Sequence, residues 1–148
     1  MFPNAKASEL LAILATIDPA SIAASTVTTG WISVANFHGF LASIQTGVLG
    51  ASATLDAKLQ QALDGSGTSA KDIAGKAITQ IVKATGDNKQ ALINVKPEDL
   101  DTVNGFGFVR LSLTVGVAAS IAGAQLVGIN PRYATADASN QAAVAQIV

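Results

Sequence analysis

Hydrophobic and polar positions alternate along the segment from Phe106 to Tyr133, which is the longest apolar stretch of the chain. In its first half, aliphatic side chains occupy every second position, namely Val109, Leu111, Leu113, Val115 and Val117. A period of two is typical of a β-strand with one buried face. The second half is rich in Ala and Gly. We interpret the whole segment as two successive strands, with a break near residues 118–120.

A membrane-spanning helix is the alternative for this segment. Residues 111–129 carry no charge, and about 19 such residues are enough to cross a bilayer. Small residues also recur every four positions, a spacing that lets membrane helices approach closely, namely Gly116, Ser120, Ala124 and Gly128. Against a span, Gln125 would need a polar partner in hydrocarbon. The Val, Thr, Ile and Ser of the first half favour strands, and we therefore expect no membrane association.

The rest of the chain contains shorter apolar runs that are separated by turn signals. We expect strands at residues 26–34, 39–49 and 89–95, a short strand within residues 73–84, and one helical turn at residues 97–100. About eight short runs bounded by turns are typical of an antiparallel β-sandwich or barrel. The sequence therefore predicts an all-β domain.

Two runs are ambiguous in their local pattern. Residues 9–17 fit a helix or a strand, and Asp18 is expected to end either one, because a residue that precedes Pro avoids the α region. Residues 54–63 favour a helix slightly, since Leu55, Leu59 and Leu63 lie on one helical stripe. Alternation over the same residues also fits a strand.

Length and composition restrict the function classes. The 148 residues fit a single domain, for which we expect an arm at residues 1–8, a β-sandwich at residues 9–133 and a tail at residues 134–148. Charged residues make up only 13%, about half the usual share, and this predicts surface that is hidden in an assembly. The net charge of −1 predicts no nucleic-acid binding. A short apolar run near the N-terminus is no convincing signal peptide, so we expect assembly in the cytoplasm.

Catalytic chemistry is not predicted. The only histidine is His38, and a catalytic or metal site would need further partners. Glu98, Asp99 and Asp101 form the only acidic cluster, but they lack the spacing of a calcium loop. The Gly-containing loops at residues 65–69 and 104–107 lack the spacing of phosphate or dinucleotide sites. We therefore expect no enzyme and no cofactor or metal. The chain also lacks Cys.

Aromatic residues are few, and three of them lie close together in the sequence. Trp31, Phe37 and Phe40 could form an exposed platform that binds sugars or a partner. Core packing is the expectation for a chain with so few aromatic residues.

Several stretches resemble small virion structural proteins of tailed bacteriophages and prophages. The similar stretches are TGWI at residues 29–32, TGVLG at 46–50, TLDAKLQ at 54–60, KDIAGKAITQ at 71–80, VRL at 109–111 and PRY at 131–133. The resemblance covers residues 9–133 and implies a jelly-roll β-sandwich that decorates, or cements, an icosahedral head. It also implies a strand at residues 54–63. We adopt the strand, because tertiary context overrides local helix propensity.

The resemblance further implies a place on the capsid surface. The expected partners are the major capsid protein and copies of the chain itself, as a homotrimer, and added interfaces would stabilise the shell by mass action. Contacts are expected from the two ends of the chain, at Phe2, Pro3, Arg132, Tyr133, Val144 and Ile147. One alternative is a head–tail connector or tail protein of a phage. Another is a carbohydrate-binding β-sandwich module, which predicts an exposed aromatic ring at Trp31 or Phe40.

Overall fold

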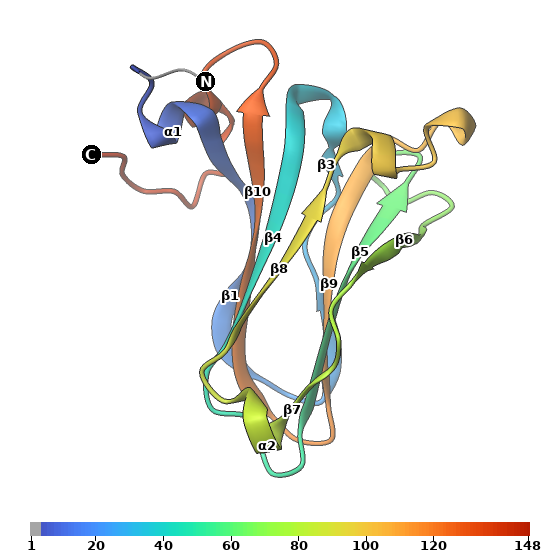
Figure 1. Cartoon of the computed structure of the whole chain (residues 1–148), viewed down its shortest axis with the longest axis vertical. Coiled ribbons are helices and arrows are strands. Elements are labelled where there is room, and N and C mark those ends of the chain that lie inside the picture. The colour runs from blue at the N-terminus through green and yellow to red at the C-terminus, as the bar shows by residue number, and fades with distance from the viewer. Residues whose placement is uncertain (1–3) are drawn as a thin grey trace.

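Two antiparallel β-sheets pack face to face in the computed structural model, which describes residues 4–148 (Figure 1). Sheet A has the strand order β1-β10-β4-β8, and sheet B has the order β2-β9-β5-β6. The strands of sheet A are β1 (Leu11–Ile22), β4 (Phe37–Thr46), β8 (Gln90–Val95) and β10 (Ser120–Pro131). Those of sheet B are β2 (Ser25–Thr28), β5 (Thr54–Ala62), β6 (Lys71–Ala77) and β9 (Phe108–Gly116), with the short strands β3 (Ile32–Ser33) and β7 (Ile81–Val82) at its sides.

Helical segments are short and lie in the connections or outside the first and last strands. They are α1 (Ala7–Leu10), α2 (Lys83–Gly86) and the 3₁₀ turns η1 (Val34–Asn36), η2 (Pro97–Asp99), η3 (Thr102–Asn104) and η4 (Ala136–Ser139). Turn η2 confirms the predicted helical turn, with Pro97 at its start and Asp99 accepting a hydrogen bond from the backbone N–H of Lys96. Within residues 4–148, every helix is too short or too polar to cross a membrane.

The eight longer strands have the connectivity of a jelly roll. β1 pairs with β10, β2 with β9, β4 with β8, and β5 with β6, all antiparallel. These four pairs are nested in the sequence, and they alternate between sheet A and sheet B. A long two-stranded ribbon wound around itself in this way is a double-sheet jelly roll. The predicted all-β antiparallel sandwich is therefore confirmed.

The longest apolar segment forms β9 and β10, as predicted, and the chain turns between them at residues 117–119. Each strand has neighbours on both sides, β9 in sheet B and β10 in sheet A. The predicted inward residues Val109, Leu111, Leu113 and Val115 are buried. Val117 was expected on the same face, and this is wrong, because it lies in the turn and is 71% exposed.

Residues 54–62 form strand β5, which confirms the strand implied by the resemblance and shows that the slight local preference for a helix was wrong. β5 pairs with β9 along its whole length. This pairing buries Leu55, Ala57 and Leu59 against the other sheet. Burial of three side chains on one face outweighs a small difference in helix propensity.

The first strand does not end at Asp18, in contrast to the sequence-based prediction, but continues to Ile22. Two features let the strand accept Pro19. β1 lies at the edge of sheet A, and the register shifts between Ile17 and Ala20, so that Pro19 occupies a bulge. Proline is tolerated at edges and bulges because it is not required to donate a ladder hydrogen bond there.

Two other predicted strands are interrupted. The strand expected at residues 26–34 is split into β2 and β3 around Gly30, and both parts pair with β9. The short strand expected within residues 73–84 becomes β6, β7 and the first residues of α2. β6 and β7 both pair with β5, so the break bends the chain along one neighbour.

The C-terminal segment folds back on β1. Ala136 in η4 is fully buried. The side-chain oxygen of Asn140 accepts a hydrogen bond from the backbone N–H of Ile13 at 2.8 Å, and the backbone N–H of Gln141 donates to the carbonyl of Ile13 at 2.8 Å. This contact covers the free edge of β1 at Ile13. Beyond it, the C-terminus stands away from the body beside β1 (Figure 1).

Candidate functional site

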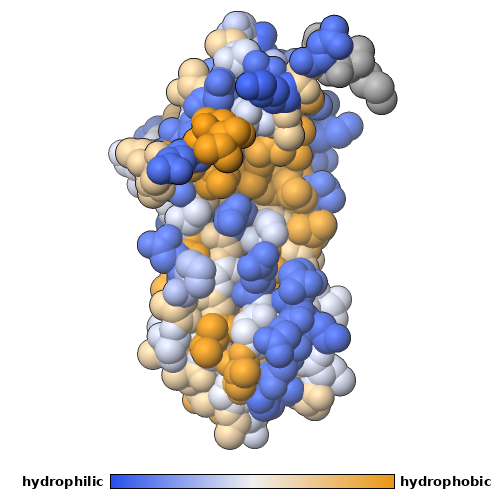
Figure 2. Space-filling view, turned by 90° about the vertical axis from the view of Figure 1, so that its left-hand side faces the viewer, coloured by the Kyte–Doolittle hydropathy of each residue, from blue (hydrophilic) through white to orange (hydrophobic). Residues whose placement is uncertain are grey.

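The outer face of sheet A, which we call the neutral face, is almost free of charge. Its four strands contain one formally charged side chain, that of Asp18. One outward row across the sheet consists of Thr16, Gln125, Ser43 and Leu92, and the next of Ile13, Val127, Leu41 and Asn94. Figure 2 looks at this side of the molecule and shows apolar side chains gathered towards both ends, with polar ones between them. Apart from Asp18, the surface is therefore wide, uncharged and partly apolar.

Sheet B carries the charges that sheet A lacks. Its strands contain Asp56, Lys58, Lys71, Asp72, Lys76 and Arg110. The four ion pairs found among residues 4–148 are Lys58–Asp72 at 2.7 Å, Lys71–Asp101 at 2.6 Å, Lys76–Asp99 at 2.9 Å and Lys83–Asp87 at 2.6 Å. They involve β5, β6, α2 and the connection after β8. The molecule thus has one charged sheet and one sheet with a single charged side chain.

The ion pairs keep their carboxylates ionised. Hydrogen bonds from the side chains of Lys58 and Gln60 lower the pKa of Asp72. The pKa values of three further carboxylates are lowered mainly by a hydrogen bond from a lysine side chain, and these are Asp87, Asp99 and Asp101. Sheet B and its connections therefore remain charged and hydrated at neutral pH.

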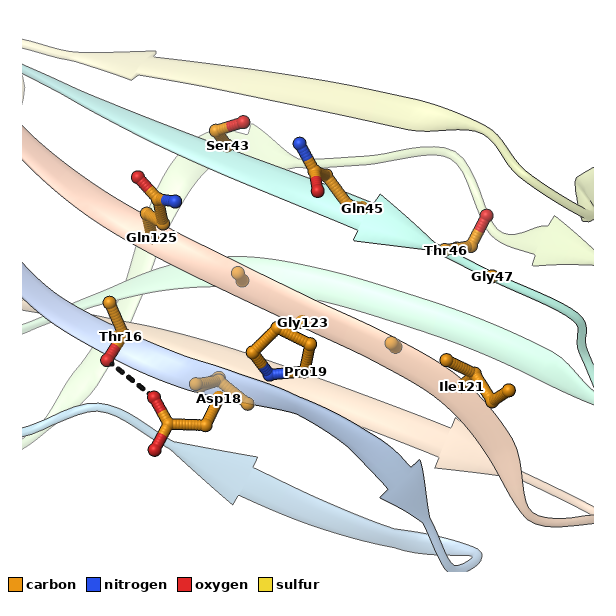
Figure 3. A pocket seen from close by; sticks show the side chains of 13 residues that line it. Thr16, Asp18, Pro19, Ser43, Gln45, Thr46, Gly47, Ile121, Gly123 and Gln125 are labelled. Atoms are coloured by element: carbon orange, nitrogen blue, oxygen red, sulfur yellow. Dashed lines mark hydrogen bonds between the residues drawn. The ribbon is translucent and has the colours of Figure 1, made fainter.

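A groove crosses the neutral face over β10, between β1 and β4 (Figure 3). Its shape follows from the bulge in β1, where Asp18 and Pro19 lie opposite Gly123 between two regular pairs of the ladder. A Cβ atom at position 123 would meet the Cα of Pro19 at 3.0 Å and its nitrogen at 3.1 Å. Only glycine lets the bulged strand come this close. The bulge and this glycine together make one wall of the groove.

The groove has a volume of about 260 Å³ and a mixed lining. Gln45 and Gln125 present their side-chain amides, and Pro19 and Ile121 supply apolar surface (Figure 3). One oxygen of the Asp18 carboxylate, Oδ1, accepts a hydrogen bond from Thr16 Oγ1 at 2.9 Å. A side-chain amide both donates and accepts hydrogen bonds. The lining is therefore suited to an uncharged chain with alternating donors and acceptors.

The structure places four of the six predicted contact residues near the C-terminal end. Tyr133 is 83% exposed and Ile147 is 50% exposed, whereas Val144 is half-buried. Arg132 is exposed, and its Nε donates to the carbonyl of Phe37 at 3.1 Å. The other two, Phe2 and Pro3, lie outside the described residues. The role of all six in contacts with other molecules stays a prediction.

The candidate catalytic or metal-binding residues do not come together in one site. His38 lies in β4, exposed at a second, wider hollow with Lys96 and Glu98. The acidic cluster is divided, because Asp99 and Asp101 pair with different lysines. Over the described part of the chain, no three His, Cys, Asp or Glu side chains are placed to hold a metal ion.

The three clustered aromatic residues do not form an open platform. Phe37 and Phe40 are each 2% exposed and meet edge to face, with ring centroids 6.0 Å apart, as core packing predicts. Trp31 is half-buried beneath the guanidinium of Arg110, 4.5 Å from the ring centroid, and beside Gly67. The exposed ring that a carbohydrate-binding module would need at Phe40 is therefore absent.

The local sequence pattern does not reveal the groove. Ser43 and Gln45 were visible as polar positions that alternate with apolar ones. The groove wall at the β1 bulge was not visible in this way, because Asp18 and Pro19 were interpreted as the end of a strand or helix rather than as a bulge. The close approach of Pro19 to Gly123 depends on the pairing of segments more than 100 residues apart. Local sequence patterns do not contain that pairing.

Comparisons with known proteins give likenesses of fold only. No family model matches the chain, and no curated protein matches its sequence. Among solved structures, a carbohydrate-binding module, CBM4, shares 16% identity over 78% of this chain and 67% of its own, with a TM-score of 0.41. A chain of the empty capsid of Triatoma virus shares 8% identity, covers 86% of this chain and 94% of its own, and has a TM-score of 0.46.

A third structure in these comparisons is VP2 from a subviral particle of infectious bursal disease virus. It shares 14% identity, covers 86% of this chain and 36% of its own, and has a TM-score of 0.47. None of the three comes from a phage, so the phage-specific part of the sequence-based expectation stays a proposal. The jelly-roll assignment rests on the strand pairing of this chain.

Proposed function

We propose that the chain is a non-enzymatic structural protein of a phage particle, a decoration or cement protein bound to the outer surface of the major capsid protein shell. The observation that carries the proposal is the neutral face, a sheet surface with Asp18 as its one formally charged side chain. The cores of protein–protein interfaces are depleted of charged residues. A wide uncharged face on a chain with few charges is therefore best explained by lasting contact with other proteins.

The division of charge gives the proposed orientation. The neutral face lies against the shell and adjacent copies of the chain, and sheet B, with its ion pairs, faces the solvent. Interfaces that form only in the assembled shell stabilise it by mass action. We propose a homotrimer as the bound form, with the two ends of the chain, including Tyr133 and Ile147, reaching neighbouring molecules. The chain would be made in the host cytoplasm and act on the virion.

The test is co-expression with the major capsid protein encoded in the same gene cluster, followed by counting the copies of the chain on purified particles. Two variants place one lysine on opposite sheets. Ser43→Lys lies on the neutral face, and Thr28→Lys lies on exposed β2 in sheet B. Burial of an unpaired ammonium costs several kcal/mol. We expect Ser43→Lys to lower the occupancy of the shell at least tenfold and Thr28→Lys to leave it unchanged.

Two results would contradict the proposal. Equal occupancy for Ser43→Lys and Thr28→Lys would show that the neutral face is not the contact surface. Location at a single vertex, instead of copies spread over the shell, would identify the chain as a head–tail connector. Electron microscopy of the same particles measures this second outcome directly.

A further inference from the structure

The tail after Gln141 presents two apolar side chains, those of Ile147 and Val148, that nothing in its own body covers. Residues 142–148 have the sequence AAVAQIV and carry no charged side chain. Ile147 is 50% exposed and Val148 is fully exposed. Uncovered aliphatic surface is unfavourable by about 25 cal/mol for each Å². This exposed apolar segment is therefore expected to find a cover in the assembled state.

The tail leaves the body at the rim of the groove. The side-chain Nε2 of Gln141 donates to Thr16 Oγ1 at 3.3 Å. Thr16 in turn donates to Asp18 on the groove wall (Figure 3). The backbone N–H of Gln141 is bonded to the carbonyl of Ile13 in the same strand. These contacts fix the point from which residues 142–148 depart, at the edge of the neutral face.

The tail does not turn into the groove of its own molecule. The backbone N–H of Val144 donates to the carbonyl of Gln141 at 3.0 Å, which forms a turn directly after the anchor. The C-terminus then stands away from the body, on the side of sheet A (Figure 1). The segment is therefore directed to where a second molecule would lie against this side.

The groove and the tail are chemically matched. Gln45 and Gln125 point over the groove and offer amide donors and acceptors (Figure 3), which is what the backbone of an extended peptide requires. The alanines of the tail are small, so they let its backbone come close to these amides. Its branched residues can pack on Pro19 and Ile121. The tail carries no side-chain charge, and the one charged side chain of the groove lining, that of Asp18, is exposed to solvent.

We propose that residues 142–148 of one copy bind in the groove of a neighbouring copy of the chain. The proposal rests on the proposed function in one respect, that copies lie side by side on a shell. Exchange of tails around a closed ring would give the homotrimer proposed above, because a head-to-tail interface closes when its rotation fits the ring. The rest of the neutral face remains free for the shell protein.

Light scattering after size-exclusion chromatography tests the exchange on the purified full-length chain. We expect an assembly of defined mass, well above the 14.9 kDa of one copy. Ile147→Asp in the tail and Gln125→Glu in the groove should each raise the dissociation constant at least tenfold, and the second change keeps the shape of the side chain. The matched control is Val103→Asp, which adds the same charge at a residue that is 95% exposed in η3 and should leave the assembly intact.

A peptide in trans identifies the site. An acetylated peptide with the sequence of residues 142–148 is titrated into the full-length Ile147→Asp chain, and NMR follows the side-chain amides of Gln45 and Gln125. We expect these signals to shift, and the shift of the Gln45 amide to be lost in the Gln125→Glu, Ile147→Asp double variant. Shifts caused by neutral oligosaccharides but not by the peptide would overturn the proposal and favour a carbohydrate site.

Other outcomes also overturn the proposal. A wild-type chain that is monomeric at 100 µM would exclude exchange between copies, even if the peptide shifted the groove signals. An assembly that Ile147→Asp leaves unchanged would exclude the tail as its cause. If particles still carry the chain in either case, the proposed decoration of the shell stands and only the exchange of tails fails.

Discussion

At the scale of single residues, Val117 is held in a left-handed conformation. Its φ is 70° in the turn between β9 and β10, although its Cβ is branched. This conformation costs an L-residue roughly 1–2 kcal/mol, and a side chain that is 71% exposed gains little from burial. Val117→Gly should raise the free energy of unfolding by about 0.5–1 kcal/mol, after the greater unfolded-state entropy of Gly is subtracted. The melting temperature should rise by about 1–4 °C.

A matched control separates strain from the loss of an exposed valine. Val103 is 95% exposed in η3 and does not have a positive φ, so Val103→Gly should not raise the melting temperature. A Val117→Gly variant that melts at or below the wild-type temperature would show that the turn at position 117 holds no strain.

Gly123 tests the origin of the groove. A methyl group at this position would meet the backbone of Pro19 at 3.0–3.1 Å, and a backbone neighbour cannot move away cheaply. We expect Gly123→Ala to lower the free energy of unfolding by roughly 1–3 kcal/mol, measured by urea titration. For Gly39→Ala in β4 of the same sheet, no atom lies within 4 Å of the added methyl. This control should lower the free energy of unfolding by less than about 0.5 kcal/mol. Equal losses would contradict the close approach of the bulge.

At the scale of elements, the sequence predicted those strands whose burial pattern is continuous. β9 was found because Val109, Leu111 and Leu113 alternate without interruption and are all buried. β5 was ambiguous, because its charged and amide residues suit a helix surface and a sheet surface equally well. Pairing with β9 decides its structure, and that information lies in a distant segment. The bulge of β1, and with it the groove, could not be predicted for the same reason.

The contact between the C-terminal segment and β1 can be tested at Asn140. Its side-chain oxygen accepts from the partly buried N–H of Ile13 at 2.8 Å. In Asn140→Ala this donor loses its partner, which should cost about 1 kcal/mol, or roughly a fivefold change in the local opening equilibrium. Hydrogen exchange of the Ile13 amide should accelerate by about that factor. Asn140→Asp keeps an acceptor oxygen and should preserve most of the protection, and equal acceleration in both variants would exclude the hydrogen bond as the cause.

At the scale of the whole molecule, the decisive feature is where the charges lie. The low charged fraction of 13% predicted surface hidden in an assembly. The charged fraction did not predict which surface is hidden, because the charged residues are scattered along the chain. They are divided between the two sheets only when the strands pair. The jelly-roll order places β5 and β6 next to each other in sheet B, and their lysines and aspartates meet there. The same order leaves β10 and β4, which carry no Asp, Glu, Lys or Arg, at the centre of sheet A.

This partition predicts how stability depends on pH. Five carboxylates have a pKa below the ordinary value of 3.8, namely Asp64, Asp72, Asp87, Asp99 and Asp101. The folded state therefore binds fewer protons than the unfolded state in acid. The stabilisation is fully present well above pH 3.8 and is lost as the pH falls below it, through the pKa values of the folded state. We expect a melting temperature that is constant from about pH 8 to about pH 5 and falls below about pH 4.

Calorimetry at a fixed protein concentration measures this dependence, and Asp72→Asn identifies its source. Asp72 accepts hydrogen bonds from Lys58 at 2.7 Å and from Gln60 at 2.8 Å. The amide that replaces this carboxylate does not titrate, so the melting temperature of the variant should be lower than that of the wild type at pH 7 and should fall less steeply in acid. Because all five carboxylates lie outside sheet A, the amides of β6 should lose protection from hydrogen exchange in acid before those of β10. A uniform loss of protection across both sheets, or an acid slope that Asp72→Asn leaves unchanged, would contradict the location of this stabilisation in the charged sheet.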